Sequence, residues 1–157
     1  MRLKDIIKAE KSAFDLGKWQ YGHIPRHAFP QSKVKESAYK FGRAYSWRIV
    51  RFTALGRRIR VKIVLNESKE IFRAKLGVEE GGDMIVLCEH EFHSSEPGWH
   101  CHFTTKPLNS VVAGTVRAGK RKRPTAIDAS AVFNVTEATA FDIAAKRYGF
   151  DQKGSLL

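Results

Sequence analysis

An alternation of period two between residues 45 and 65 constrains the fold more than any other feature of this chain. In this stretch, YSWRIVRFTALGRRIRVKIVL, apolar and polar residues alternate on both sides of Gly56. Successive side chains of a strand point to opposite faces, so the pattern predicts two antiparallel strands that turn near Gly56. With Leu55 paired to Ile59, the inward face carries Ile49, Leu55, Ile59, Val61, Ile63 and Leu65. The outward face carries Arg48, Phe52, Arg60 and Lys62.

A second hairpin is predicted over residues 84–105. It contains CEHEFHSSEPGWHCHFTT, which holds both cysteines and four histidines. With residues 93–98 as the loop, the paired positions are Phe92 with Trp99, Glu91 with His100, and Glu89 with His102. One face then carries Glu89, Glu91, His100, His102 and Thr104, and the other carries Cys88, His90, Phe92, Trp99, Cys101 and Phe103. A slip of one residue would instead place His90 beside the histidine pair, and the sequence leaves both registers open.

The segments outside the hairpins predict helices. Apolar spacing and capping residues indicate helices over residues 3–16, 32–41, 66–76 and 136–148. The fold class that follows is α+β, with an antiparallel sheet of about four to five strands and flanking helices. We expect one α+β domain over 1–157, made of a helical segment (1–42), a sheet core (43–106), a basic loop (107–133) and a C-terminal helix (134–150).

The charge balance of the chain favours an anionic partner. The sequence has 28 Lys and Arg against 16 Asp and Glu, a net charge of +12. Phosphates neutralised by such side chains release counterions, so nucleic acid is the expected partner, with an acidic protein as the alternative. The basic residues expected to contact nucleic acid are Arg48, Arg60, Lys62, Arg117, Lys120, Arg121, Lys122 and Arg123. No apolar run approaches the ~20 residues of a membrane span, and charges interrupt the N-terminal segment, so we expect a cytoplasmic protein without a membrane role.

The histidine-rich hairpin predicts a metal site. Two imidazoles two residues apart on one strand, with carboxylates across the ladder, can converge on one divalent ion. The expected ligands are His100, His102, Glu89 and Glu91, with His90 added in the slipped register. This mixed nitrogen and oxygen set suits Mn²⁺, Mg²⁺ or Zn²⁺.

The stretch WHCHF resembles the signature of the HUH endonucleases, the replication initiator and relaxase superfamily. The resemblance implies a metal ion on two strand histidines and a tyrosine, on a later helix, that attacks a phosphodiester in single-stranded DNA. It assigns His100 and His102 to the histidine pair and Glu89 or Glu91 to the third ligand. It assigns Tyr148 to the nucleophile.

Three functional hypotheses follow from these features. The first is metal-dependent cleavage or transfer of nucleic-acid phosphodiesters, with single-stranded DNA as a candidate substrate and His100, His102 and Tyr148 as catalytic residues. The second is a non-catalytic, basic nucleic-acid-binding or inhibitor protein of mobile-element type, with a structural metal or none. The third is a metal-independent ribonuclease that uses a histidine pair as acid and base.

Overall fold

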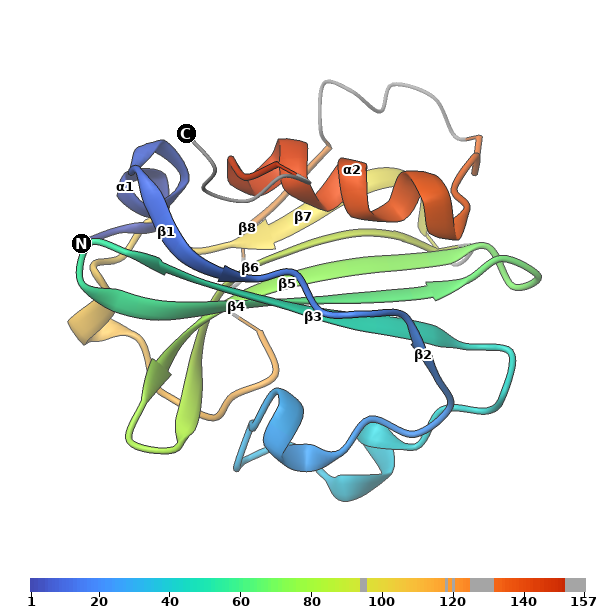
Figure 1. Ribbon diagram of the computed structural model, residues 1–157, viewed down its shortest axis with the longest axis horizontal. Coiled ribbons are helices and arrows are strands. Elements are labelled where there is room, and N and C mark those ends of the chain that lie inside the picture. The colour runs from blue at the N-terminus through green and yellow to red at the C-terminus, as the bar shows by residue number, and fades with distance from the viewer. Residues whose placement is uncertain (94–95, 118, 120, 125–131, 152–157) are drawn as a thin grey trace.

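One antiparallel sheet dominates the computed structural model, which describes residues 1–93, 96–117, 119, 121–124 and 132–151 (Figure 1). Within these residues the sheet has eight strands in the order β1-β3-β4-β5-β6-β7-β8, and β2 also pairs with β3. The strands are β1 (Lys11–Asp15), β2 (Gln20–Tyr21), β3 (Ser46–Ala54), β4 (Arg57–Asn66), β5 (Ile71–Glu80), β6 (Asp83–His93), β7 (Glu96–Phe103) and β8 (Arg121–Pro124). The helices are α1 (Leu3–Lys8) and α2 (Glu137–Tyr148), and short 3-10 turns span Arg26–Ala28, Glu36–Tyr39 and Leu108–Ser110. The predicted α+β class and antiparallel sheet are confirmed, and the sheet is wider than expected.

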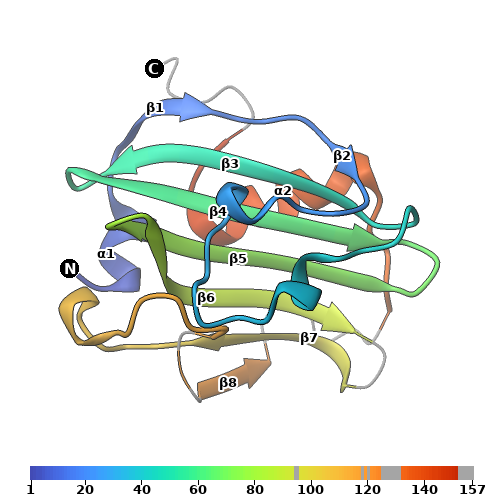
Figure 2. The same ribbon diagram turned by 90° about the horizontal axis from the view of Figure 1, so that it is seen from below.

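Each face of the sheet is covered by a different part of the chain. Helices α1 and α2 lie on one face, where the main apolar core forms (Figure 1). The segment 22–45 crosses the other face, over a smaller core that contains Phe29, Tyr39 and Trp47 (Figure 2). Apolar side chains on both faces of β3 to β6 are therefore buried, and the position of each in the alternation decides which core it joins.

The β3–β4 hairpin forms where predicted but in a different register. Phe52, not Leu55, stands opposite Ile59, because a two-residue turn at Leu55 and Gly56 joins the strands. Both turn residues have positive φ, 52° and 74°, as the turns that match strand twist require. The predicted inward face is therefore wrong: Leu55 is half exposed, Phe52 joins the core under α2, and Ile49 lies on the opposite face.

One predicted helix is shortened and a second is replaced by a strand. Helix α1 ends at Lys8, and residues 11–15 instead pair with β3 at the edge of the sheet. The helix predicted over 66–76 is wrong because Asn66 closes a turn, accepting hydrogen bonds from the Ser68 hydroxyl and the Lys69 N–H at 2.9 and 3.0 Å. The chain beyond this turn is β5, in which alternate residues are fully buried between β4 and β6. Pairing on both sides outweighs the local helical spacing.

The C-terminal helix is confirmed by its caps. The Thr136 side chain accepts a hydrogen bond from the Thr139 N–H, and Gly149 ends the helix with a φ of 76°. The helix expected over 32–41 is reduced to the short turn Glu36–Tyr39, whose last residue is buried in the smaller core. Across the described residues, no helix has the length and apolar character needed to cross a bilayer.

Candidate metal centre

The β6–β7 hairpin sets the register on which the candidate site depends. Glu91 stands opposite His100, and Glu89 stands opposite His102, as the first of the two predicted registers requires. The slipped register is wrong. All four side chains therefore point to the face covered by the segment 22–45, away from α2.

A group of three ligand atoms forms on this face. Nε2 of His100 lies 2.9 Å and Nε2 of His102 lies 3.1 Å from Oε1 of Glu91. The three ligand atoms all lie within 4.8 Å of one another. The residues are buried, with 1% of Glu91, 4% of His100 and 8% of His102 exposed. A buried carboxylate and two imidazoles with this convergence can hold a metal ion.

The spacing of these atoms fits a coordination shell. With metal–ligand bonds of about 2.1 Å, neighbouring ligands lie about 3.0 Å apart in an octahedron and about 3.4 Å apart in a tetrahedron. The two nitrogen–oxygen distances of 2.9 and 3.1 Å are close to the octahedral value, and they are also ordinary hydrogen-bond lengths between these groups. Three protein ligands would leave other positions of such a shell open, as catalytic sites require.

A third imidazole, which sequence reasoning missed, reaches the same carboxylate. Nε2 of His93 lies 3.2 Å from Oε1 of Glu91, and its ring meets the His100 ring edge-on with centroids 5.0 Å apart. The His93 side chain is 17% exposed, more than that of either other histidine. The sequence feature that could have identified His93 is its position two residues after Glu91, which places it on the same face. The predicted hairpin places His93 in the loop, but β6 continues through it.

Glu89, a predicted ligand, is paired with a lysine instead of joining this group. Its Oε2 lies 3.5 Å from Nζ of Lys75, and both side chains are 7% exposed. Burial would raise the pKa of Glu89, but the charges of Lys75, Arg73 and Lys62 outweigh it and hold that pKa at about 2. Glu89 is therefore an ionised neighbour of the group. Arg73 stands beside Glu91 in the same way, with its Nε 3.7 Å from Oε2.

His90 lies on the face that carries α2. Its ring stacks on Trp99 with centroids 5.3 Å apart, and 1% of the residue is exposed. Burial is the main cause that lowers the pKa of His90 to about 3. The structure therefore separates His90 from the metal candidates, because it belongs to the register that did not form.

Tyr148 is also on the α2 face, so the structure does not bring it to the histidine pair. Its hydroxyl donates a hydrogen bond of 2.6 Å to the carbonyl of Ala74, and none of the residue is exposed. Burial raises the pKa of Tyr148 well above its usual value, which keeps the phenol protonated. The sheet stands between this hydroxyl and the site, and the nucleophile role that the resemblance assigned to it has no geometric support.

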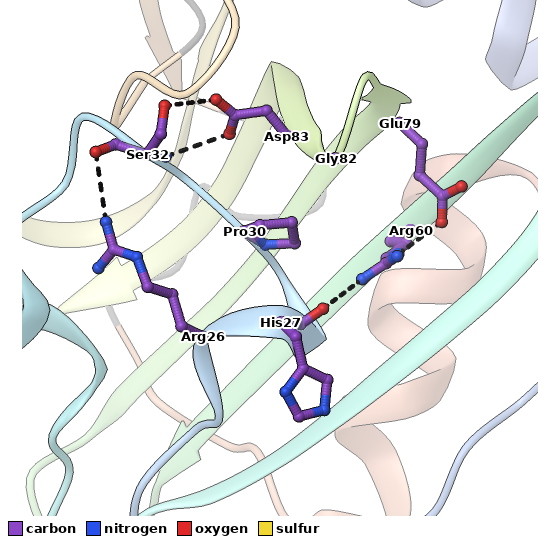
Figure 3. A pocket seen from close by; sticks show the side chains of 8 residues that line it. All are labelled: Arg26, His27, Pro30, Ser32, Arg60, Glu79, Gly82 and Asp83. Carbon is purple, nitrogen blue, oxygen red and sulfur yellow. Dashed lines mark hydrogen bonds and ion pairs between the residues drawn. The ribbon is translucent and has the colours of Figure 1, made fainter.

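Two of the predicted nucleic-acid contacts are used inside the protein. The Arg60 guanidinium donates to Oε1 of Glu79 at 2.7 Å and to the carbonyls of His27 and Ala28 at 2.8 and 2.9 Å. Figure 3 shows this arrangement in a surface pocket where the His27 imidazole points away from the arginine. Arg48 lies on the other face of the sheet, where its guanidinium stacks 4.3 Å from the centre of the Phe141 ring.

The other predicted basic contacts that the structure describes are Arg117, the backbone of residues 121–123, and Lys62. Arg117 is exposed, and its charge is among the causes, after burial, that lower the pKa of His102. The run 121–123 is part of β8, not a loop, and its backbone places Lys122 opposite His102. Lys120, and the side chains of 121–123, lie outside the described residues. Lys62 is buried on the same face as the histidines.

Comparisons with protein-family models, with curated proteins and with solved structures gave no significant match. The site must therefore be interpreted from its own geometry. The resemblance to HUH endonucleases rests on the WHCHF stretch alone, and what the structure supports of it is a buried group that can hold a metal ion.

Proposed function

We propose that the protein is a divalent-metal-dependent enzyme that cleaves or transfers nucleic-acid phosphodiesters. The observation that carries this proposal is the convergence of ligand atoms from Glu91, His100 and His102 within 4.8 Å of one another. A divalent ion held by these three residues would supply Lewis acidity to a scissile phosphate, a contribution of several kcal/mol to transition-state stabilisation.

The charges around the group support a phosphate-bearing substrate. Arg73 and Lys75 lie on the strand beside the two glutamates, and the backbone of the basic run lies beside the two histidines. Cations held near a metal stabilise the charge that develops on a phosphate during its transfer. The net charge of +12 extends this attraction over the whole protein.

The nucleophile in this proposal is water and not a tyrosine. Tyr148 lies across the sheet with its hydroxyl bonded to a backbone carbonyl. His93 is the most exposed imidazole of the group and contacts Glu91, so it is placed to exchange a proton with water at the edge of the site. Water as nucleophile predicts cleavage without a covalent protein–DNA adduct.

The second candidate function is a non-catalytic nucleic-acid-binding protein with a structural ion. The burial of the group favours it, because structural metal sites are closed to solvent. The two candidates share the metal and differ in turnover. Both differ from the histidine-pair ribonuclease, which would work in EDTA.

Cleavage of single-stranded DNA and RNA, with and without EDTA, tests the proposal. We expect cleavage that EDTA abolishes and that Mn²⁺, Mg²⁺ or Zn²⁺ restores. H102Q should lose it, while H27Q, which changes an exposed histidine outside the site, should retain it. Binding without cleavage at any metal concentration would refute the enzyme and leave the structural-ion candidate. EDTA-resistant cleavage would support the ribonuclease.

A further inference from the structure

A small cavity lies beside the metal candidates on the same face of the sheet. It has a volume of about 120 Å³, and its walls come from the segment 31–41, from β4, β5 and β6, and from residues 116–117. Its charged lining residues are Lys62, Arg73, Lys75, Arg117 and Glu89. Four cations therefore face one carboxylate, and that carboxylate is the one paired with Lys75.

Lys62 is the unusual member of this lining. Only 8% of it is exposed, and its ammonium lies 5.2 and 5.8 Å from the centres of the Phe29 and Tyr39 rings. Within the described part of the chain, no carboxylate lies within ion-pair distance of this ammonium. Burying an ammonium without an ion-pair partner costs free energy, and contact with ring faces offsets only part of that cost.

The neighbour of Lys62 makes this cost larger. Lys75 stands directly opposite Lys62 in the β4–β5 ladder, and it too is buried. Like charges that face each other across a ladder destabilise a sheet. Arg73 adds a further unsatisfied donor, because its buried Nε has no hydrogen-bond partner. An anion between these groups would pair with Lys62, accept a hydrogen bond from Arg73 and offset the like-charge contact between Lys62 and Lys75.

We propose that this cavity binds a phosphoryl group, with Lys62 as its innermost contact. The volume corresponds to about four water molecules, enough for a phosphoryl group. Drug-sized ligands need about 300–1,000 Å³, so a base with its sugar would remain outside. The Arg73 side chain is 43% exposed and marks the side from which such a group enters.

The position of the cavity connects it with the metal candidates. Glu89 lines the cavity and stands opposite His102 in the ladder, and Arg117 lines it from the other side. A phosphoryl group in the cavity would thus lie on the same face of the sheet as the candidate ion. The biological ligand, a phosphate of a nucleic-acid strand, rests on the proposed function, but anion binding itself does not require the metal.

Calorimetric titration of EDTA-treated protein with inorganic phosphate, at low salt, tests this inference. K62M replaces the ammonium with an apolar chain of similar length, and it should fold, because its surroundings include two aromatic rings. We expect phosphate to bind the wild type and to bind K62M at least tenfold more weakly. K69M is the matched control, since Lys69 is exposed and also lies over a tyrosine ring, that of Tyr45. Its affinity should stay within twofold of the wild type.

Two further arms identify the recognised group and its source. A nucleoside 5′-monophosphate should bind at least as tightly as inorganic phosphate if strand ends are the ligand, and the nucleoside alone should not bind. Equal phosphate affinity in wild type and K62M, or equal binding of nucleoside and nucleotide, would overturn the inference. Metal binding, measured on the wild type and on K62M beside phosphate binding, separates the two proposals. A wild-type protein that binds metal but no phosphate would refute the cavity proposal and leave the metal centre standing.

Discussion

The substitution E91Q tests the metal centre through the stability that a bound ion adds. It keeps the size of the side chain and one oxygen acceptor for His100 and His102, but removes the charge of the carboxylate ligand. For the wild type, metal at a hundred times its Kd stabilises the folded state by about 2.7 kcal/mol. In a chain of 157 residues this corresponds to a rise in Tm of about 5–11 °C.

The expected effect of E91Q on this rise can be calculated. Loss of an outer partner of a metal ligand weakens binding by about 10–100-fold, and loss of a direct ligand costs at least the upper value. A hundredfold weaker Kd at the same metal concentration leaves about 0.4 kcal/mol, or about 1–2 °C. The assay is thermal unfolding of EDTA-treated protein with and without added Mn²⁺ or Zn²⁺.

The matched control for this experiment is E89Q. Glu89 lies on the same strand and the same face and is also buried, but it pairs with Lys75. E89Q should have a lower Tm than the wild type without metal, because it leaves a buried lysine without its partner. Its metal-induced rise should nevertheless match that of the wild type. Equal rises in E91Q and the wild type would refute the assignment of Glu91 as a ligand.

Three other substitutions test the account elsewhere in the fold. Burial, with Lys75 nearby, lowers the pKa of Lys62 from 10.5 to about 7. The free energy of unfolding therefore carries the whole cost of burying this charge below pH 7, and that cost disappears as the pH rises toward 10.5. Urea unfolding should therefore show wild-type stability rising relative to K62M by up to about 1.4 kcal/mol per pH unit between pH 7 and 10, and parallel profiles would contradict the burial of a charged Lys62. Y148F should lose about 1 kcal/mol of stability through its buried hydrogen bond but keep full cleavage activity in the assay above; loss of activity in a folded variant would restore the tyrosine as a catalytic candidate. L55N should raise Tm by about 1–4 °C, because asparagine tolerates the positive φ of 52° at this exposed turn, and a lower Tm would show that the turn differs from the one described.

The elements that were predicted correctly are those whose local signals agree. The β6–β7 hairpin was predicted with two registers open, and the structure has the one that places both glutamates and both histidines of the site on one face. Helix α2 followed from a threonine and a glycine at its ends, both of which act as caps. In each case the local pattern and the tertiary contacts require the same structure.

The elements that were missed depend on contacts distant in sequence. Phe72, Ala74 and Leu76 alternate as a strand requires, but Ile71, Phe72 and Lys75 also fit a helical spacing. Pairing with β4 and β6 decides between these patterns, and a local reading does not include it. Edge pairing with β3 likewise turns residues 11–15 from helix into strand.

The candidate site was predicted in part for the same reason. The histidine pair and Glu91 could be found because they lie on one hairpin. The burial of Lys62 could not, because the segment 22–45 causes it by folding over that face from a distant part of the chain. Glu89 and Glu91 look equivalent in sequence, and Lys75 on the adjacent strand is what distinguishes them.

X-ray absorption of the zinc-loaded protein tests the central claim most directly. The account predicts one zinc per chain with nitrogen and oxygen neighbours at about 2.0–2.2 Å, two of them imidazoles, and loss of that spectrum in E91Q. A sulfur neighbour at about 2.3 Å would place the ion on a cysteine of the opposite face. That result, or the failure of zinc to bind at all, would contradict the site formed by Glu91, His100 and His102.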